Sequence, residues 1–524
     1  MIAGMAESFD ILFQNDDLVA VGKPAGLATH SPDGERPGLA EMLGKQLGCR
    51  LGVHQRLDAA TSGVIVFSKS AAGAKKLARA FENRRLSKVY YAVVCGCPPE
   101  KTGTWQHSLV HENGITLERA GGKQSVSRYA VERSFGPFSL LRLELLTGMT
   151  HQLRVQCALA GCPILGDSLY GGGDCAPRLF LHAHSLKLPE DAGVPEIVSS
   201  LPGLFERGFA PLVEAILANS PLPEKMAQDE ACRVLVPQHS GIPELIVEKI
   251  ASVLHVRHLE PSAESVWNVE SLNTFFELAK KQFDCSSVSY HVHQSPQSCG
   301  SCAAFAKQFA EVPDPLVASE NGNLYTFEFS GNATGLYLDQ RENRAWVTQN
   351  AWGRVLNLFA YTCAFSVCAA RSARVCETTS VDAAPAALNR GRANFELNHI
   401  DTAAHRFVHQ DVFKYLERCD RNGVRFDTII CDPPSFGRFG KIVFSLEKDL
   451  GRLLDACFRL VTKHGVVLFC INHRKISIAS LRAQLHQVLD KYRLHPQVCE
   501  VFVNDSATGP LGVGTDLKTI RVVL

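Results

Sequence analysis

The hydrophobic pattern of the first 190 residues mixes short strand-like runs with segments of helical spacing. The apolar runs are rich in β-branched side chains, which is typical of strands. Because strands and helices do not alternate strictly, we expect an α+β domain in this part of the chain. The expected strands are 18–21, 64–68, 89–94, 128–131 and 140–146, and the clearest expected helix is 71–83.

From Arg354 onward the pattern changes, because strand-like apolar runs now alternate with longer amphipathic segments. Regular alternation of this kind predicts a parallel, doubly wound sheet. We therefore expect an α/β Rossmann-like domain in the last third of the chain. Its expected strands are 354–358, 378–382, 426–431 and 466–471, and its expected helices are 386–397, 446–461 and 478–489.

The region between the two patterns carries weaker signals. It holds several prolines and little periodicity at first, which indicates a linker. A length of 524 residues accommodates several units of roughly 150 residues each. We predict a first catalytic domain at 1–190, a linker at 191–240, a connecting subdomain at 241–330 and a second catalytic domain at 331–524.

Composition narrows the class of protein. Hydrophobic residues make up 46% and charged residues 20% of the chain, and the net charge is +1, as in ordinary globular proteins. No apolar run approaches the ~18 residues of a membrane span, and the first residues lack the pattern of a signal peptide. The 18 cysteines are scattered through apolar segments, which favours buried thiols over a disulfide framework. We expect a cytoplasmic protein with no membrane partner, and the oligomeric state stays open.

One carboxylate of the first domain has a position suited to chemistry. Asp58 lies in the segment HQRLDAATSG at 54–63, directly before the expected strand 64–68. An aspartate in such a turn most often bonds its own loop, and spacing alone favours that structural role. A second polar segment, TGMTHQLR at 147–154, ends one strand and begins a helix, and it adds weight to a catalytic role.

Six motifs in order resemble those of a known enzyme family. They are KPAGLATHS at 23–31, RLDAATSG at 56–63, KVY at 88–90, TGMTHQLR at 147–154, PILGDSLY at 163–170 and LFLHAHSL at 179–186. Together they resemble the RluA-type pseudouridine synthases over about residues 10–190.

This resemblance implies isomerisation of uridine to pseudouridine in RNA, without a cofactor. It makes Asp58 the essential carboxylate and implies that Arg154 holds it in a salt bridge. It also implies that Tyr90 stacks on the target base and that Arg56 helps to open the RNA helix. These residue types suit the reaction, because an arginine favours an ionised carboxylate and an aromatic ring receives an unstacked base.

The second domain carries the signs of a nucleoside cofactor without a pyrophosphate. The turn FAYTCAF at 359–365 follows the first expected strand and contains no glycine, which disfavours a dinucleotide. Asp382 ends the next strand, where an acid can bind a pair of ribose hydroxyls. Asp411 begins a helix and can accept a hydrogen bond from an adenine amine. S-adenosylmethionine (SAM) satisfies these observations.

Three segments of this domain resemble a group of RNA methyltransferases. They are YLDQRENR at 337–344, VLNLFAYTCAFS at 355–366 and CDPPSF at 431–436, and they resemble the class I methyltransferases of the bacterial large-subunit rRNA group. The resemblance implies SAM as the cofactor and RNA, ribosomal RNA in particular, as the partner. The implied cofactor-binding residues are Asn357, Phe359, Tyr361, Thr362, Asp382, Asp411 and Asp432, and the implied methyl-acceptor site is Asp432, Pro433, Pro434 and Phe436.

Two features bear on whether and where a methyl group is transferred. Members of this group usually carry Gly-Gly where Cys363 and Ala364 stand, so an RNA-binding or ribosome-assembly factor with an inactive methyltransferase-like domain is the alternative function. Transfer to cytosine C5 requires a thiolate, for which Cys431 and Cys470 are the candidates. Because the segment 469–474 resembles the guanine-N7 form of the group, we expect methylation at a base nitrogen.

The connecting region holds residue types that bind metals. Cys285, His291, His293, Cys299 and Cys302 include a Cys-x-x-Cys, but the other gaps match no recognised zinc spacing. We predict no metal and assign these cysteines as ordinary thiols. The sequence as a whole predicts a bifunctional RNA-modifying enzyme, a pseudouridine synthase joined to a SAM-dependent methyltransferase.

Overall fold

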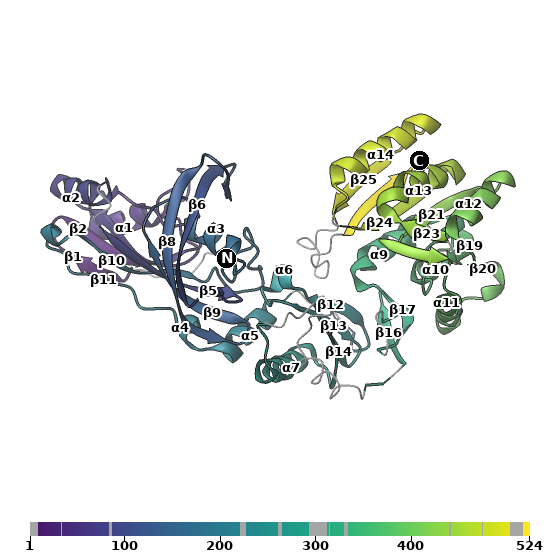
Figure 1. The fold of residues 1–524 in the computed structure, drawn as a ribbon, viewed down its shortest axis with the longest axis horizontal. Helices are drawn as coiled ribbons and strands as arrows, with labels where there is room; N and C mark the ends of the chain where they lie inside the picture. Colours follow the sequence, from purple (N-terminus) through teal and green to yellow (C-terminus); the bar gives the residue numbers. More distant parts are fainter. Residues whose placement is uncertain are drawn as a thin grey trace.

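The computed structural model describes residues 9–524 apart from 33, 83–85, 221–226, 260–264, 293–311, 314, 330–333, 440–441, 474 and 504–516. An N-terminal domain built on a large sheet lies on one side of a small central sheet, and an α/β domain lies on the other (Figure 1). Within the described residues, no helix has the length and apolar character needed to span a membrane.

The N-terminal domain is built on a largely antiparallel sheet, which confirms the α+β expectation. Its strands are β1 (Ile11–Gln14), β2 (Leu18–Lys23), β3 (Gly52–Val53), β4 (Ser62–Ser68), β5 (Ser87–Cys95), β6 (Thr102–Glu112), β7 (Ile115–Glu118), β8 (Lys123–Phe135), β9 (Phe138–Leu145), β10 (Leu181–Lys187) and β11 (Ile197–Val198). Its helices are α1 (Leu39–Leu47), α2 (Ala71–Glu82) and α3 (Gln152–Leu159), followed by the 3-10 turn η1 (Glu190–Ala192). The strand order is β1-β2-β4-β10-β5-β9-β8-β6-β7, and the β4–β10 pair is parallel. Each strand predicted here coincides with, or lies inside, an observed strand to within one residue.

A close approach of two strands determines where the Asp58 loop enters this sheet. β4 is buried along its whole length, as its run of small and β-branched side chains requires. Gly63 has φ +115°, and a Cβ atom there would lie 2.1 Å from the carbonyl oxygen of Ala183 on β10. Glycine is therefore needed for β4 to pair with β10, and the loop carrying Asp58 joins the sheet at this pairing.

The central sheet has the strand order β12-β13-β14-β15. Its elements are β12 (Ala231–Leu235), β13 (Leu245–Ile250), β14 (Val253–His258), β15 (Ser287–Val292) and the helix α7 (Val269–Phe283). Between it and the N-terminal domain lie α4 (Gly203–Glu206), α5 (Phe209–Ala218) and α6 (Pro237–Ser240).

The helices α4, α5 and α6 and the strand β12 fall in 191–240, where the sequence predicted a linker, and they correct that prediction. Three of the prolines behind the prediction stand at helix starts: Pro202 precedes α4, Pro211 is in the first turn of α5, and Pro237 begins α6. Proline is compatible with these positions, because the first N–H groups of a helix have no partner within it.

Hydrophobic clusters join the central sheet to both of its neighbours. Phe209 on α5 packs against Phe138 on β9 and Trp267 before α7, with ring centroids 6.3 and 6.0 Å away. Phe138 and Trp267 belong to one hydrophobic cluster, and Phe209 packs against it. This cluster runs from the N-terminal sheet into the central sheet. On the other side, Ala231 of β12 shares a buried cluster with Tyr325 of the C-terminal half. The central sheet is therefore packed into both domains.

The C-terminal domain has the doubly wound sheet that the alternating pattern predicts. Its strands are β18 (Gly353–Leu358), β19 (Val375–Asp382), β20 (His405–His409), β21 (Phe426–Cys431), β24 (Val461–Asn472), β25 (Val498–Val503) and β26 (Leu517–Val523). Its helical elements are η3 (Leu338–Gln340), α9 (Arg341–Asn350), α10 (Ala364–Ala370), α11 (Pro385–Leu397), η4 (Thr402–Ala404), α12 (Val412–Arg421), α13 (Leu446–Leu460) and α14 (Ile478–Tyr492). Two hairpins complete it, β16 (Leu316–Glu320) with β17 (Asn323–Phe327) and β22 (Phe436–Phe439) with β23 (Ile442–Ser445).

The strand order of this sheet shows where a ligand binds. The order is β20-β19-β18-β21-β24-β26-β25, with β20 through β24 parallel and β26 antiparallel to its neighbours. From β18 the chain winds outward through β19 and β20, and then returns to the other side of β18 as β21. This reversal places a crevice outside the carboxyl ends of β18 and β21, which is where open α/β sheets bind ligands.

Two candidate active sites

The first site forms where the Asp58 loop meets α3, and a buried lysine fixes that loop. The ammonium of Lys23, at the end of β2, donates to the carbonyl oxygens of Pro24, Leu27 and Ala59 at 2.9, 2.7 and 2.9 Å. Burial lowers the pKa of Lys23 to about 7. Because Ala59 follows Asp58 directly, these hydrogen bonds hold the catalytic loop against the end of β2.

Arg154 on α3 joins Asp58 to a second carboxylate, which the sequence analysis did not single out. Its Nε and Nη2 donate to the two oxygens of Asp167 at 2.7 Å each, and its Nη1 lies 3.5 Å from Oδ2 of Asp58. The Asp167 side chain is fully buried, whereas that of Asp58 is 29% exposed. The bidentate pair with Asp167 therefore fixes the guanidinium, and the expected salt bridge to Asp58 is present beside it.

His151 also faces Asp58, from the residue that precedes α3. Its backbone is left-handed, with φ 56°, and its Nε2 lies 3.8 Å from Oδ2 of Asp58. On the other side of the ring, Nδ1 lies 3.0 Å from the hydroxyl of Tyr170. Burial lowers the pKa of His151, so the imidazole is neutral at neutral pH. Asp58 thus has a permanent cation and a neutral ring beside it.

The four residues expected in pseudouridine formation line one cavity of about 300 Å³. Arg56 and Asp58 come from the loop before β4, Tyr90 comes from β5 and Arg154 comes from α3. Tyr90 is buried, and burial together with the nearby Asp58 raises the pKa of its hydroxyl, which stays protonated. A carboxylate, its arginine and an aromatic ring therefore surround a space suited to one unstacked base.

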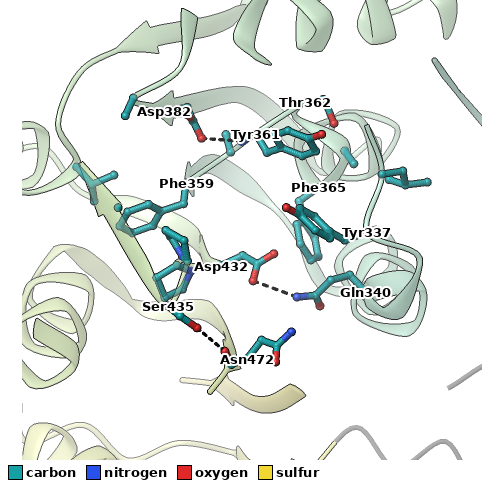
Figure 2. Close-up of a pocket in the computed structure, with 18 of the residues that line it drawn as sticks. Tyr337, Gln340, Phe359, Tyr361, Thr362, Phe365, Asp382, Asp432, Ser435 and Asn472 are labelled. Atoms are coloured by element: carbon teal, nitrogen blue, oxygen red, sulfur yellow. Dashed lines mark hydrogen bonds between the residues drawn. The ribbon is translucent and has the colours of Figure 1, made fainter. Parts of the chain in front are cut away.

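The second site is a cavity of about 500 Å³ at the carboxyl ends of β18, β19 and β21 (Figure 2). The turn after β18 forms one wall, and the Asp-Pro-Pro segment after β21 forms the wall opposite. The predicted residues that line it are Phe359, Tyr361, Thr362, Asp382, Asp411, Asp432, Pro433 and Pro434.

Two residues predicted for this site do not line the cavity. Asn357 is buried inside β18, where its Nδ2 donates to the hydroxyl of Ser366 on α10 at 2.9 Å. Phe436 begins β22 and is 64% exposed, outside the cavity wall. Side chains of a strand alternate between its two faces, so a residue next to the site in sequence can point away from it. Asn357 is corrected, because it supports the packing of α10 instead. Phe436 lies on the surface between Ser435 and Gly437, which both line the cavity, and its place in the methyl-acceptor site stays a prediction.

The two acids expected to bind the cofactor each have backbone partners. Asp382 accepts from the N–H groups of Tyr361 and Ala384 at 2.8 Å each, which holds its carboxylate at the cavity rim (Figure 2). Asp411 precedes α12 and accepts from the N–H of Lys414 at 3.0 Å. Each carboxylate keeps further lone pairs for a ligand, because a carboxylate has about four acceptor positions. Acids at these two strand ends fit the hydroxyls and amine of a nucleoside.

The turn between β18 and α10 contains three non-glycine residues with left-handed backbone. The φ angles are 56° at Phe359, 46° at Tyr361 and 60° at Cys363. Such angles favour glycine, and the resemblance noted in the sequence implies a glycine at the last of these positions. Gly391 on α11 makes room for the extra thiol, because a Cβ atom there would lie 2.4 Å from Sγ of Cys363. The Cys363 side chain is thus accommodated because Gly391, on the neighbouring helix, has no side chain.

Asp432, at the end of β21, is the acid nearest the centre of the cavity. Its Oδ1 accepts from Nε2 of Gln340 at 3.0 Å. Burial and the nearby Asp339 raise the pKa of Asp432, whereas Arg344 and the Gln340 hydrogen bond lower it. The net result is a pKa of about 7. The carboxyl group therefore changes its protonation state close to neutral pH.

The candidate thiol nucleophiles lie away from the cavity. Cys431 and Cys470 are fully buried in β21 and β24, neither lines the cavity, and burial raises the pKa of both thiols well above its usual range. Across the described ranges, no group of three or more His, Cys, Asp or Glu side chains is arranged to hold a metal. Three of the sequence candidates for a zinc site, His293, Cys299 and Cys302, lie outside those ranges.

Two family models match the chain. The model described as RNA pseudouridylate synthase matches residues 17–159. The model described as S-adenosylmethionine-dependent methyltransferase matches residues 279–487. The first match contains Arg56, Asp58, Tyr90 and Arg154. The second match contains the predicted residues that line the second cavity, and it stops before the end of the C-terminal domain.

Curated relatives fall into the same two groups. An uncharacterized RNA pseudouridine synthase of Chlorobaculum parvum is 34% identical over 47% of this chain and 75% of that protein. Ribosomal large subunit pseudouridine synthase C of Rickettsia conorii is 32% identical over 38% of this chain and 69% of that protein. Ribosomal RNA large subunit methyltransferase K of Neisseria meningitidis is 37% identical over 34% of this chain. The match spans 51% of that methyltransferase, about half of its length.

Solved structures resemble each half separately. A methyltransferase in complex with S-adenosylhomocysteine is 24% identical, with a TM-score of 0.48, over 57% of this chain and 76% of that one. Human RNA pseudouridylate synthase domain containing 1 is 28% identical, with a TM-score of 0.35, over 43% of this chain and all of that one. From its sequence relatives and the two family models, the chain belongs to the RNA pseudouridine synthase family through its N-terminal domain and carries a SAM-dependent methyltransferase domain in its C-terminal half.

Proposed function

We propose that this chain modifies ribosomal RNA at two kinds of position, forming pseudouridine at the first cavity and methylating a base at the second. The observation that carries the first assignment is the Asp58 carboxylate beside Arg154, whose guanidinium is already fixed by Asp167. The names of the rRNA-modifying relatives from Rickettsia and Neisseria support the choice of RNA. Such an enzyme acts in the cytoplasm, where ribosomal RNA is made and assembled.

In the first reaction the N1–C1′ bond of uridine breaks, a C5–C1′ bond forms, C5 loses its proton and N1 gains one. Asp58 supports this as a charged group, either by attacking the sugar carbon or by removing a sugar proton. Arg154 keeps that charge favourable. Tyr90 stacks on the base after it leaves the RNA helix, and Arg56, at the cavity mouth, contacts the displaced strand.

In the second reaction the chain holds SAM in the cavity between the turn after β18 and the Asp-Pro-Pro segment. Asp382 accepts from the ribose hydroxyls and Asp411 from the adenine amine, while the rings of Phe359 and Phe444, 5.1 Å apart, form an apolar wall. SAM supplies an electrophilic methyl group when bound. The acceptor in this proposal is a base nitrogen that carries a hydrogen, which guanine N7 does not. Asp432 accepts that proton, so that the nitrogen lone pair is free to react.

A base nitrogen is the methylated atom in this proposal. Transfer to carbon 5 of cytosine would need a thiolate that can reach the base. Cys431 and Cys470 are buried outside the cavity, and their raised pKa values disfavour the thiolate. Cys431→Ala and Cys470→Ala should therefore retain methyl transfer. Trapping of the enzyme on RNA that contains 5-fluorocytidine would contradict the assignment.

The proposed function is tested by mapping modified nucleotides in RNA from cells that lack the gene. Mass spectrometry of ribosomal and transfer RNA should show the loss of a pseudouridine and of a methylated base. Complementation with the unmutated chain should restore both, and complementation with Asp432→Asn should restore the pseudouridine alone. If ribosomal RNA from the deletion strain is fully modified, the proposed substrate is wrong.

A further inference from the structure

The YLDQRENR motif at 337–344 forms η3 and the start of α9, and its residues Tyr337, Asp339, Gln340 and Arg344 line the methyltransferase cavity. None of the roles assigned above uses its Gln340. This side chain is 3% exposed, and its Nε2 lies 3.0 Å from Oδ1 of Asp432. Figure 2 shows Gln340 reaching Asp432 from the right of the view, with the other carboxylate oxygen directed into the cavity.

A buried chain of hydrogen bonds decides which way Gln340 faces. Asn343 donates through Nδ2 to Oε1 of Gln340 at 2.7 Å and to the hydroxyl of Thr519 at 3.0 Å. Arg521 on β26 donates to Oδ1 of Asn343 at 2.9 Å, which fixes the Asn343 amide in turn. Because Oε1 of Gln340 already accepts the hydrogen bond from Asn343, the amide is oriented with its Nε2 toward Asp432. Gln340, Asn343 and Thr519 are all buried, so the arrangement is isolated from water.

We propose that Gln340 is a positioning residue for Asp432 in methyl transfer. Its N–H group occupies one carboxylate oxygen and leaves the other to accept the proton of the methyl-acceptor nitrogen. The inference rests on the proposed function and adds a residue to it. Asn343 and Thr519 act one and two hydrogen bonds further away, by keeping the Gln340 amide in this orientation.

The groups that face Asp432 set the sign of the expected effect. Burial raises the pKa of Asp432, Asp339 raises it further, and Arg344 and Gln340 lower it. The hydroxyl of Tyr337 and the thiols of Cys431 and Cys470 also face this carboxyl, and their raised pKa values keep them neutral near pH 7. Removing the Gln340 donor therefore raises the pKa of Asp432. A protonated carboxyl cannot accept a proton, so methyl transfer falls as pH drops through that pKa.

The test compares the full-length chain with Gln340→Met, an apolar replacement of similar length. Transfer of a tritiated methyl group from SAM to RNA of the deletion strain is measured between pH 5.5 and 9.5. For Gln340→Met the midpoint of the acid limb should move up by about one to two pH units, the size of one hydrogen bond to a charged group. Affinity for S-adenosylhomocysteine, measured by calorimetry at pH 8, reports any separate effect on the cofactor, because Gln340 also lines the cavity. A shifted pH midpoint with affinity changed less than about twofold supports the positioning role.

Gln349→Met is the matched control, because Gln349 is an exposed glutamine on α9, the helix that follows η3. It should leave the pH profile unchanged. An acid limb with the same midpoint in Gln340→Met and the unmutated chain would overturn the inference. If Gln340→Met does not fold, the isosteric Thr519→Val removes the far acceptor instead. It should produce a smaller upward shift, and an unshifted midpoint there would equally overturn the inference. Absence of transfer by the unmutated chain would refute the proposed function itself.

Discussion

Asp58 and Asp432 are carboxyl groups that each line a cavity, but the residues around them suit them to different chemical roles. Asp58 stands next to Arg154, a permanent cation that is itself held by the buried Asp167. Asp432 stands in a buried position close to Asp339, and the pKa of Asp432 rises to about 7 as a result. The first group is arranged to keep a charge, and the second is arranged to take and release a proton near neutral pH.

Replacing Asp58 should separate the two activities. Asp58→Asn keeps the size of the side chain and removes the charge that the isomerisation needs. Pseudouridine formation on RNA from the deletion strain should fall to background, whereas methylation should stay within about twofold, because the two cavities share no residue. Both products can be counted in one mass-spectrometric digest. Retained isomerisation by the purified variant would contradict the catalytic role proposed for Asp58.

Replacing Asp382 should weaken the cofactor site. Asp382→Ala removes a charged acceptor for the ribose hydroxyls, and affinity for S-adenosylhomocysteine should fall about 10- to 150-fold, as expected for 1.5–3 kcal/mol. Calorimetry on the full chain measures this. Asp490→Ala, an exposed aspartate on α14, serves as the control and should bind normally. Equal binding by the two variants would remove Asp382 from the site.

At the scale of elements, the turn between β18 and α10 shows how a strained loop and a neighbouring helix fit each other. Cys363 has left-handed backbone, and its thiol fills the space that Gly391 leaves open on α11. The side chain at one position therefore limits the side chain at the other, although they lie on different elements.

Gly391→Ala should destabilise the domain by about 1–3 kcal/mol, because its new methyl group overlaps the Cys363 thiol. Cys363→Gly removes that thiol and gives the left-handed position its preferred residue. The double variant should lose less stability than Gly391→Ala alone. Thermal melts of the four proteins form a double-mutant cycle, and additive changes would show that the two positions do not interact.

Elements with a clean hydrophobic period were predictable from the sequence, and those with buried ion pairs were not. β4 and β21 contain short apolar runs, VIVF at 64–67 and IIC at 429–431, which is why these strands were found. In the central sheet, Arg233 and Glu248 are buried together with their charged atoms 2.9 Å apart. Charged residues inside strands interrupt the pattern that sequence analysis depends on, so β12 to β15 were missed.

In the candidate sites, too, some residues could be predicted from the sequence and others could not. Acids at strand ends, such as Asp382 and Asp432, are marked by their place in the sequence, since parallel strands bring their carboxyl ends together. The partner of Arg154 is not marked in that way, because Asp167 reaches it through the tertiary fold. Its place in the PILGDSLY motif was the available signal, and the motif alone gave no role. Asn357 was misplaced because sequence does not reveal which face of its element a side chain occupies.

At the scale of the whole molecule, buried neutral histidines link stability to pH. Burial lowers the pKa of His182, between β4 and β11, and of His255, in the central sheet, to about 4 each. Between pH 6.5 and 4 the unfolded chain binds these protons and the folded chain does not. The free energy of unfolding should therefore fall as pH drops through this window, by up to about 1.4 kcal/mol per pH unit for each histidine.

Urea denaturation at pH 7, 5.5 and 4.5 measures that slope. His182→Gln keeps a hydrogen-bonding side chain and removes one titrating group, so its stability should depend less steeply on pH. His464→Gln, a change on the exposed start of β24, is the control and should keep the full slope. The assignment of His182 fails if both variants lose stability at the same rate as the unmutated chain.

The central sheet packs its apolar side chains into the N-terminal domain on one side and into the methyltransferase domain on the other. The two domains are therefore hard to separate. A gene split on either side of the sheet would yield two proteins, each with an uncovered apolar surface that favours aggregation. Separation would require several compensating polar substitutions to arise together. Two enzymes that joined through such a sheet are inherited, expressed and lost as one.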